Sequence, residues 1–253
     1  MIFYASYNDG IAHALLSAGS VRSMTAPVIS IDGPVGSGKT TVGRMVAERY
    51  GFVCLDSGLF YRAATLVVLT KQVNPQDLSR VLEATKSLSL EFVPSPDESF
   101  GTRVFNHGKD VTSALQSSEV ESIVSDISKI RELRLQLLEV QREFIGQGGV
   151  VAIGRDIGTV VWPDAEMKIY LDATLEARTE RKWRQRRNSG EVIAVSEARR
   201  SLESRDRIDS TRIYAPLTPA ADAVYIDSSD LSPALIADEI DRLMRDRDLL
   251  NYS

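Results

Sequence analysis

Cysteine and histidine are scarce in this sequence of 253 residues. Cys54 is the only cysteine, and the two histidines, His13 and His107, lie far apart. A disulfide framework and a thiolate zinc site are therefore excluded, and the histidines lack the spacing of metal ligands. A lone thiol suits a reducing compartment, so we expect the protein to be cytoplasmic.

Long apolar runs and an excess of positive charge are also missing. The longest apolar candidate near the start, residues 11–21, is interrupted by His13, Ser17 and Gly19, so no membrane span is expected. The net charge is −5 and the sequence pI is about 5.3, so the molecule as a whole repels nucleic acid and anionic membranes. We expect neither as a partner, and any anion site must be a local basic cluster.

The composition is that of a globular domain. Hydrophobic residues make up 43% and charged residues 26% of the chain, with no internal repeat or low-complexity tract. The length allows one α/β domain with insertions. Residues 1–23 lack the basic segment of a secretory signal. We expect them to be a disordered extension ahead of a single folded domain at 24–250, which would begin at Met24.

Hydrophobic patterning predicts strands that alternate with helices, and hence a parallel sheet covered on both faces. Between residues 78 and 129 the pattern differs: a helix, two strands joined by a loop, a turn at 106–108, and a return to helix from Val111. The expected strands are 27–31, 52–55, 88–93, 102–105, 150–153, 167–171 and 224–226. The expected helices are 39–50, 61–69, 78–85, 130–144, 176–187, 196–209 and one that begins at Ser232-Pro233.

The strongest motif is the segment GPVGSGKT at 33–40, which matches G-x-x-x-x-G-K-[ST]. It lies between a predicted strand and a predicted helix, as a phosphate-binding P-loop does; a glycine-rich turn without this role is the alternative. Lys39 would reach the β- and γ-phosphate oxygens of ATP, and the Thr40 hydroxyl would be a ligand of Mg²⁺. The expected ATP-binding residues are Gly33, Pro34, Val35, Gly36, Ser37, Gly38, Lys39, Thr40 and Thr41.

Charged residues at the ends of two other predicted strands suggest a phosphate-bearing acceptor. In the segment LDSGLFYR at 55–62, Arg62 suits a phosphate, and an arginine that caps a surface helix is the alternative. In the segment AIGRDIG at 152–158, Arg155 and Asp156 follow a buried strand, where charges need a partner. A structural Arg–Asp pair that closes the sheet is the alternative here.

A very basic helix is predicted near residue 180, with arginines at every third position. They are Arg178, Arg181, Arg184 and Arg187. Such a run is usually a solvated face, but beside a P-loop it favours a moving lid that brings guanidinium groups to the transferring phosphoryl group. Further on, Arg205, Asp209 and Arg212 lie at helical spacing, which we interpret as ribose and phosphate recognition.

The chain resembles the bacterial cytidylate kinase family over residues 24–250, through ordered segments that include IDGPVGSGKTT, LDSGLFYR, NHGKDVT, AIGRDIGTVVWPDA, KIYLDA and RDRIDSTRIYAPL. The resemblance implies an α/β fold: a P-loop three-layer α/β/α core with a parallel sheet (24–78 and 130–250), a monophosphate-binding insert at about 79–129 and an arginine-rich lid at about 174–212. It also implies transfer of the γ-phosphoryl group of ATP, with Mg²⁺, to cytidine or deoxycytidine monophosphate. We expect a monomer.

The resemblance further implies roles for single residues, and one departure from the family pattern. Ser125, Arg134 and Asp156 would read the cytosine edge; Arg62, Arg155 and Arg212 would hold the acceptor phosphate; and Arg205 and Asp209 would contact the ribose. Ser57 and Tyr61 would also bind the substrate. The implied catalytic residues are Lys39, Arg155, Arg181 and Arg212. Where the family usually carries an arginine, this chain has Gln116.

Two other functions fit a P-loop. A kinase for another small acceptor, such as adenylate, guanylate or shikimate, would use the same core. A nucleotide-dependent switch would drive a partner protein rather than make a product. The sequence has no N-K-x-D motif for guanine, and its lid holds more arginine than a switch needs, which favours a kinase.

Overall fold

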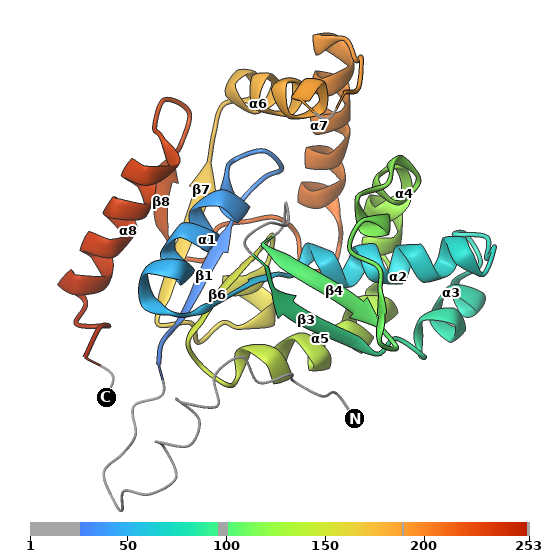
Figure 1. Cartoon of the computed structure of the whole chain (residues 1–253), viewed down its shortest axis with the longest axis horizontal. Coiled ribbons are helices and arrows are strands. Elements are labelled where there is room, and N and C mark those ends of the chain that lie inside the picture. Colours follow the sequence, from blue (N-terminus) through green and yellow to red (C-terminus); the bar gives the residue numbers. More distant parts are fainter. Residues whose placement is uncertain (1–25, 96–100, 189, 252–253) are drawn as a thin grey trace, which may run out of the picture.

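A five-stranded parallel sheet forms the centre of the molecule (Figure 1). The structure, a computed structural model, describes residues 26–95, 101–188 and 190–251, so the expected extension at 1–23 and Met24 lie outside the described residues. The strand order is β2-β6-β1-β7-β8. The strands are β1 (Val28–Asp32), β2 (Val53–Asp56), β6 (Val150–Gly154), β7 (Met167–Asp172) and β8 (Val224–Asp227), each within one residue of its predicted bounds.

The register of this sheet brings three loops to one edge. β1 lies between β6 and β7, with Asp32 opposite Gly154 on one side and Tyr170 on the other. β2 pairs with β6, so that Asp56 lies opposite Ile153. The loops that follow β1, β2 and β6 therefore leave the sheet side by side, at the carboxyl edge where open α/β sheets bind their ligands.

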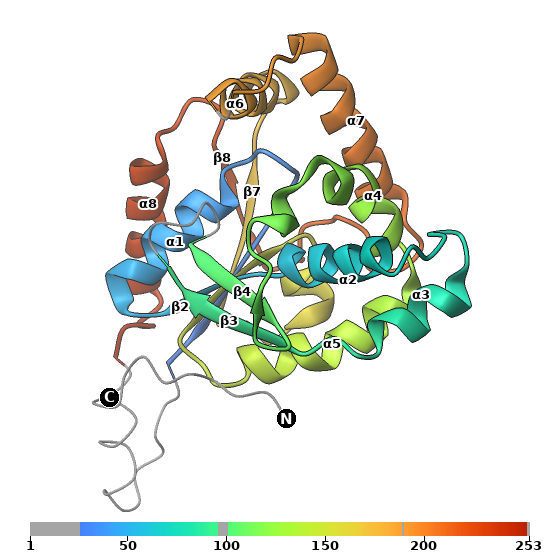
Figure 2. The same cartoon turned by 45° about the vertical axis from the view of Figure 1, so that its right-hand side comes forward.

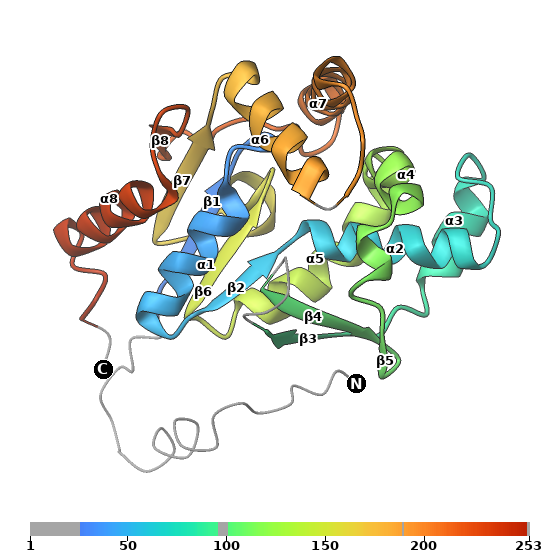
Figure 3. The ribbon, with the colours of Figure 1, turned by 45° about the horizontal axis from the view of Figure 1, so that its top comes forward.

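Helices cover both faces of the sheet, which confirms the predicted three-layer α/β/α class. Every residue of β1 and β6 is buried, because each strand has a helix layer above and below it. One face packs against α1 (Lys39–Tyr50) and α8 (Pro233–Asp246), and the other against α2 (Gly58–Thr70) and α5 (Arg131–Ile145). Figure 3 shows α1 and α8 on one side of the strands.

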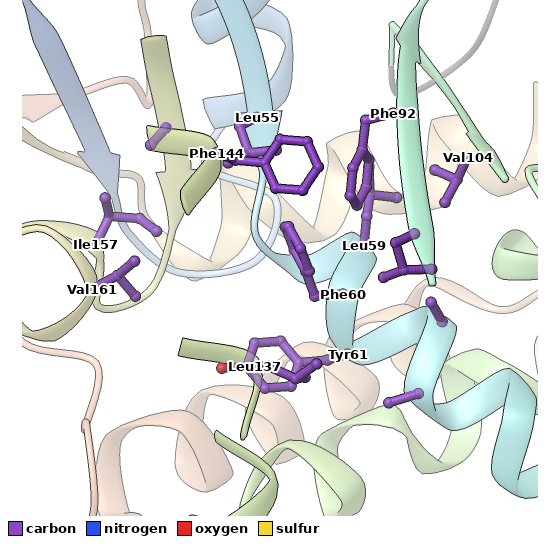
Figure 4. Close-up of a cluster of buried hydrophobic side chains, with 14 of the residues drawn as sticks. Leu55, Leu59, Phe60, Tyr61, Phe92, Val104, Leu137, Phe144, Ile157 and Val161 are labelled. Atoms are coloured by element: carbon purple, nitrogen blue, oxygen red, sulfur yellow. The ribbon is translucent and has the colours of Figure 1, made fainter. Parts of the chain in front are cut away.

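Aromatic side chains connect the second helix layer to the insert (Figure 4). The Phe60 and Phe92 rings lie 4.7 Å apart between centroids, and Phe144 meets Phe92 edge-on at 5.2 Å and 89°. Such pairs add about 0.5–1.5 kcal/mol each to the burial of their surface. Because Phe60 is on α2 and Phe144 on α5, this cluster holds the insert against the helices that carry several of the predicted acceptor residues.

The insert is a small antiparallel sheet with flanking helices. It contains α3 (Leu78–Thr85), β3 (Leu90–Pro94), β4 (Thr102–Asn106), β5 (Lys109–Asp110) and α4 (Ser118–Ser128). The predicted turn at 106–108 joins β4 to β5, a short strand that was not predicted. The return to helix expected from Val111 is a short 3₁₀ turn, Ala114–Gln116, and α4 itself begins at Ser118, where the Ser117 side chain caps it by accepting a hydrogen bond from the Val120 amide.

Two helices project above the carboxyl edge of the sheet (Figures 1 and 2). They are α6 (Leu175–Asn188) and α7 (Val195–Thr211), and α7 contacts α4 of the insert. A π-helical turn, Ile157–Val161, follows β6 and was not predicted. Among the described helices, none is both long and apolar enough to cross a bilayer.

Candidate active site

The P-loop leads into the N-terminus of α1, and the side chain of its lysine, Lys39, bonds to the main chain of the loop itself. Three of its glycines, Gly33, Gly36 and Gly38, have φ of 153°, 81° and 97°, which side chains rarely adopt. The Lys39 ammonium donates to the Pro34 carbonyl over 2.7 Å. Burial, together with the nearby Arg155 guanidinium, lowers the pKa of this ammonium well below its usual value. An anion bound at the loop would favour the charged ammonium and so offset the free-energy cost of burying it.

Two oxygen atoms beside the P-loop fit a magnesium ion. The Thr40 hydroxyl lies 3.4 Å from a carboxylate oxygen of Asp56, at the end of β2. Mg²⁺ is commonly held by one or two such protein oxygens together with phosphate oxygens and water. No cluster of three or more histidine, cysteine or acidic side chains that could hold a metal occurs in 26–95, 101–188 or 190–251. Thr41, the last predicted ATP-binding residue, is exposed on α1.

A pocket lies between the carboxyl edge of the sheet, the insert and α7. The structure brings every predicted acceptor residue to its wall, from α2, α4, α5, the loop after β6, and α7. They are Ser57, Tyr61, Arg62, Ser125, Arg134, Arg155, Asp156, Arg205, Asp209 and Arg212, and the wall also includes Gly58, Val124 and Ser128. Segments more than 150 residues apart in the sequence thus share one concave site.

Buried ion pairs connect several of these residues. Asp156 accepts from Arg134 over 2.5 Å and from Arg212 over 3.2 Å. Asp209 accepts from Arg155 over 3.0 Å. The Arg134 guanidinium also lies 4.9 Å above the ring of Tyr61, whose pKa is raised to about 12, first by burial. The side chains are therefore held in place before any ligand arrives.

The pocket nevertheless carries an excess of positive charge. Its wall has five arginines against two aspartates, an excess of three charges in a protein of net charge −5. Burial, then the proximity of Arg155 and Arg62, lowers the pKa of Arg205 to about 10, and burial also lowers that of Arg62. The buried Nε of Arg205 has no hydrogen-bond partner in the described part of the chain. This arrangement favours an anionic ligand.

The predicted arginine run of α6 does not act as one face. Arg178 and Arg181 contact the P-loop, through the Val35 and Gly36 carbonyls respectively, and Arg181 also bonds the main chain of Ser228 and Ser229. By contrast, Arg184 is exposed and pairs with Glu180, while Arg187 lies over the Trp183 ring. Arg181, predicted to be catalytic, thus lies at the P-loop and not in the wall of the pocket that the predicted acceptor residues line.

Three acidic residues of the site were missed from the sequence. Asp32 accepts hydrogen bonds from the Ile157 and Gly158 amides and so holds the turn that follows Arg155 and Asp156. Asp56 faces Thr40, and Glu121 on α4 pairs with Lys182 and Arg186 of α6. The sequence did contain a signal for Asp32 and Asp56, since each is a carboxylate that directly follows a predicted strand. Glu121 has no such signal.

A family model and several curated relatives agree on one family. A family model described as cytidylate kinase matches residues 29–246. A cytidylate kinase from Thermotoga sp. (strain RQ2) is 41% identical over 220 residues, or 87% of this chain and 97% of that protein. One from Desulfitobacterium hafniense (strain Y51) is 39% identical over 225 residues, or 87% of this chain and 93% of that protein. A bifunctional pantoate ligase/cytidylate kinase from Synechococcus sp. (strain JA-3-3Ab) is 41% identical, and the match spans 41% of its length. The chain belongs to the cytidylate kinase family.

Proposed function

We propose that the protein transfers the γ-phosphoryl group of ATP to cytidine monophosphate, and also to deoxycytidine monophosphate. The observation that carries this proposal is the pocket beside the P-loop, where a carboxylate held between two buried guanidiniums lies next to an excess of positive charge. The carboxylate and its guanidiniums can bind the polar edge of a pyrimidine base, and the excess of positive charge can bind a phosphate. The names of the relatives at about 40% identity support the same substrate.

The base would lie against Ser125, Arg134 and Asp156. Cytosine presents a ring nitrogen and a carbonyl oxygen as acceptors and an exocyclic amine as donor. The buried Arg134 Nε lacks a hydrogen-bond partner among the described residues, so it is a donor that a base can satisfy. The carboxylate of Asp156 can accept from the amine, and the Ser125 hydroxyl can do either.

The acceptor phosphate would be held by Arg62, Arg155 and Arg212, with Arg205 and Asp209 toward the ribose. Arg62 is held in place by the carbonyl of Leu115, from which its Nη1 lies 2.9 Å. Gln116, the departure from the family pattern, is the next residue and is exposed. Since it does not line the pocket, the departure does not touch these proposed contacts.

Catalysis would consist of alignment and charge neutralisation, because the acceptor phosphate is already anionic and needs no general base. Lys39, released from the Pro34 carbonyl, would contact the transferring group, and Arg155 and Arg212 would align the acceptor. Arg181 would fix the lid to the P-loop. Mg²⁺, held by Thr40 with Asp56 beside it, would neutralise charge on the β- and γ-phosphates when bound. In this proposal residues 79–129 are the monophosphate insert and 174–212 the lid.

A coupled assay of ATP-dependent diphosphate formation tests the proposal across the four nucleoside monophosphates and their deoxy forms. We expect fast turnover of the cytidine and deoxycytidine monophosphates, weak use of purines, and loss of activity with EDTA. Lys39→Met should lower kcat on the order of 10³-fold. Lys71→Met, which removes an exposed lysine, is the matched control. A purine preference would overturn the base contacts, and no transfer to any acceptor would overturn the kinase proposal.

A further inference from the structure

Glu121 of α4 reaches out of the insert and contacts three cations of the lid helices. Its carboxylate lies 2.7 Å from the Lys182 ammonium, 2.5 Å from Arg186 Nη2 and 3.6 Å from Arg205 Nη1. Its side chain is 14% exposed, and those of its three partners are 15–21% exposed. Ion pairs sheltered to this degree are screened less by salt than surface pairs.

These contacts join two parts of the molecule that meet above the acceptor pocket. Glu121 is on α4, while Lys182 and Arg186 are on α6 and Arg205 is on α7. Figures 2 and 3 show α4 lying beside α7 at this place. The arginine that Glu121 approaches on α7 is itself part of the pocket wall. One carboxylate of the insert therefore acts on both lid helices and on a pocket residue.

Glu121 offsets part of the positive charge of this cluster, in which Arg186 also pairs with Glu191 of the lid. Burial opposes its ionisation, but Lys182, Arg186 and Arg205 together hold its pKa below the usual value. The pKa of Lys182 is lowered, first by burial and then by the two arginines, although Glu121 opposes this. Without the carboxylate, these three cations, all on α6 and α7, would lose their negative partner on α4. The attraction that holds the lid helices against the insert would then be lost.

We propose that Glu121 is a positioning residue, which holds α6 and α7 against the insert and thereby places Arg205 at the acceptor pocket. The kinetic part of this inference rests on the proposed function, but the structural part does not. Its structural consequence is a lid that lies close to α4 before substrates bind. Its kinetic consequence is that the carboxylate acts on transfer without touching either substrate.

A distance measurement tests the structural part. Spin labels at Ser122→Cys on α4 and Gln185→Cys on α6 occupy exposed positions, in a chain with Cys54→Ala. We expect one narrow distance distribution in the ligand-free protein, and a broader one with longer distances after Glu121→Gln. The control is Glu119→Gln, an exposed glutamate of the same helix, which should leave the distribution unchanged. Unchanged distances after Glu121→Gln would overturn the inference.

Kinetics test the second part. Because small misplacements of aligned groups are costly, Glu121→Gln should lower kcat roughly 10- to 100-fold while the KM for ATP stays within about threefold. The effect should not add to that of Lys182→Met, since both remove the same contact. A lower Tm with unchanged kcat, or fully additive effects, would reduce Glu121 to a structural role. If Glu121→Gln alters the distances but the protein phosphorylates no monophosphate, the proposed function is refuted and the positioning role of Glu121 still stands.

Discussion

Arg134 donates to Asp156 over 2.5 Å, and both side chains are at most 5% exposed. A second guanidinium, from Arg212, approaches the other oxygen of the same carboxylate. To remove one partner of such a buried group costs about 3–5 kcal/mol, because an uncompensated charge remains. The carboxylate is thus held in one orientation by the protein, as the base contact proposed for it requires.

Replacing Asp156 with asparagine should change which base is accepted. The amide keeps an oxygen for Arg134 but turns one acceptor into an NH₂ donor, which suits the carbonyl of uracil better than the amine of cytosine. We expect the ratio of kcat/KM for cytidine over uridine monophosphate to fall about 10- to 100-fold, as one base contact is worth about 1–3 kcal/mol. The measurement is the coupled assay with both substrates, and Asp126→Asn, an exposed carboxylate on α4, is the control. An unchanged ratio would remove Asp156 from the base site.

Replacing Arg205 with glutamine should weaken binding of the acceptor without lowering the thermal stability of the ligand-free protein. Burial and the repulsion from Arg155 and Arg62 lower the pKa of Arg205 to about 10, so Asp209 and Glu121 offset the cost of its charge only in part while no ligand anion is bound. We expect the ligand-free variant to have a Tm that is equal or a few degrees higher, and a KM for the acceptor that is about 10- to 100-fold higher. Thermal unfolding with and without cytidine monophosphate measures both effects. Arg200→Gln, exposed on the same helix, should change neither, and a lower Tm with unchanged KM for Arg205→Gln would contradict the argument.

The sequence predicted those features that depend on local patterns. The strands of the core, the P-loop and the charged residues that follow β2 and β6 each carry a signal within about ten residues, and the parallel sheet then brings the strand ends together. Ser125 and Arg134 carry no such local signal and were implied only by the family resemblance. The late start of α4 was missed because a side-chain cap at Ser117 outweighs helical composition before it. The contact of Glu121 with Lys182 joins residues 61 positions apart and depends on how the lid packs. No spacing in the sequence encodes such a pair. The packing of α6 also decides which of its arginines contact the P-loop and which face solvent, so this division was not predicted either.

Two glycines of the P-loop should respond differently to alanine. A Cβ on Gly33 would lie 2.0 Å from the Leu171 carbonyl oxygen, which is main chain and cannot move aside. A Cβ on Gly38 would meet nothing within 4 Å, so only its φ of 97° is unfavourable. We expect Gly33→Ala to lower the free energy of unfolding by about 3 kcal/mol or more and Gly38→Ala by about 1–2 kcal/mol. Urea unfolding of both variants measures the difference, and equal losses would show that steric contact at Gly33 is not the cause.

Asp32 should make stability depend on pH in the opposite sense to a surface carboxylate. Burial raises its pKa to about 6, although the Gly158 and Ile157 amides partly offset this. Between about pH 4 and 6 the folded protein therefore binds a proton that the unfolded chain has already lost, so the contribution of Asp32 to stability falls as the pH rises through this range. The loss amounts to about 3 kcal/mol and is complete above about pH 6. Urea unfolding of the wild type and Asp32→Asn at several pH values isolates this contribution. The wild type should lose stability relative to the variant from pH 4 to 6 and run parallel to it above, whereas a constant difference throughout would mean that Asp32 titrates normally.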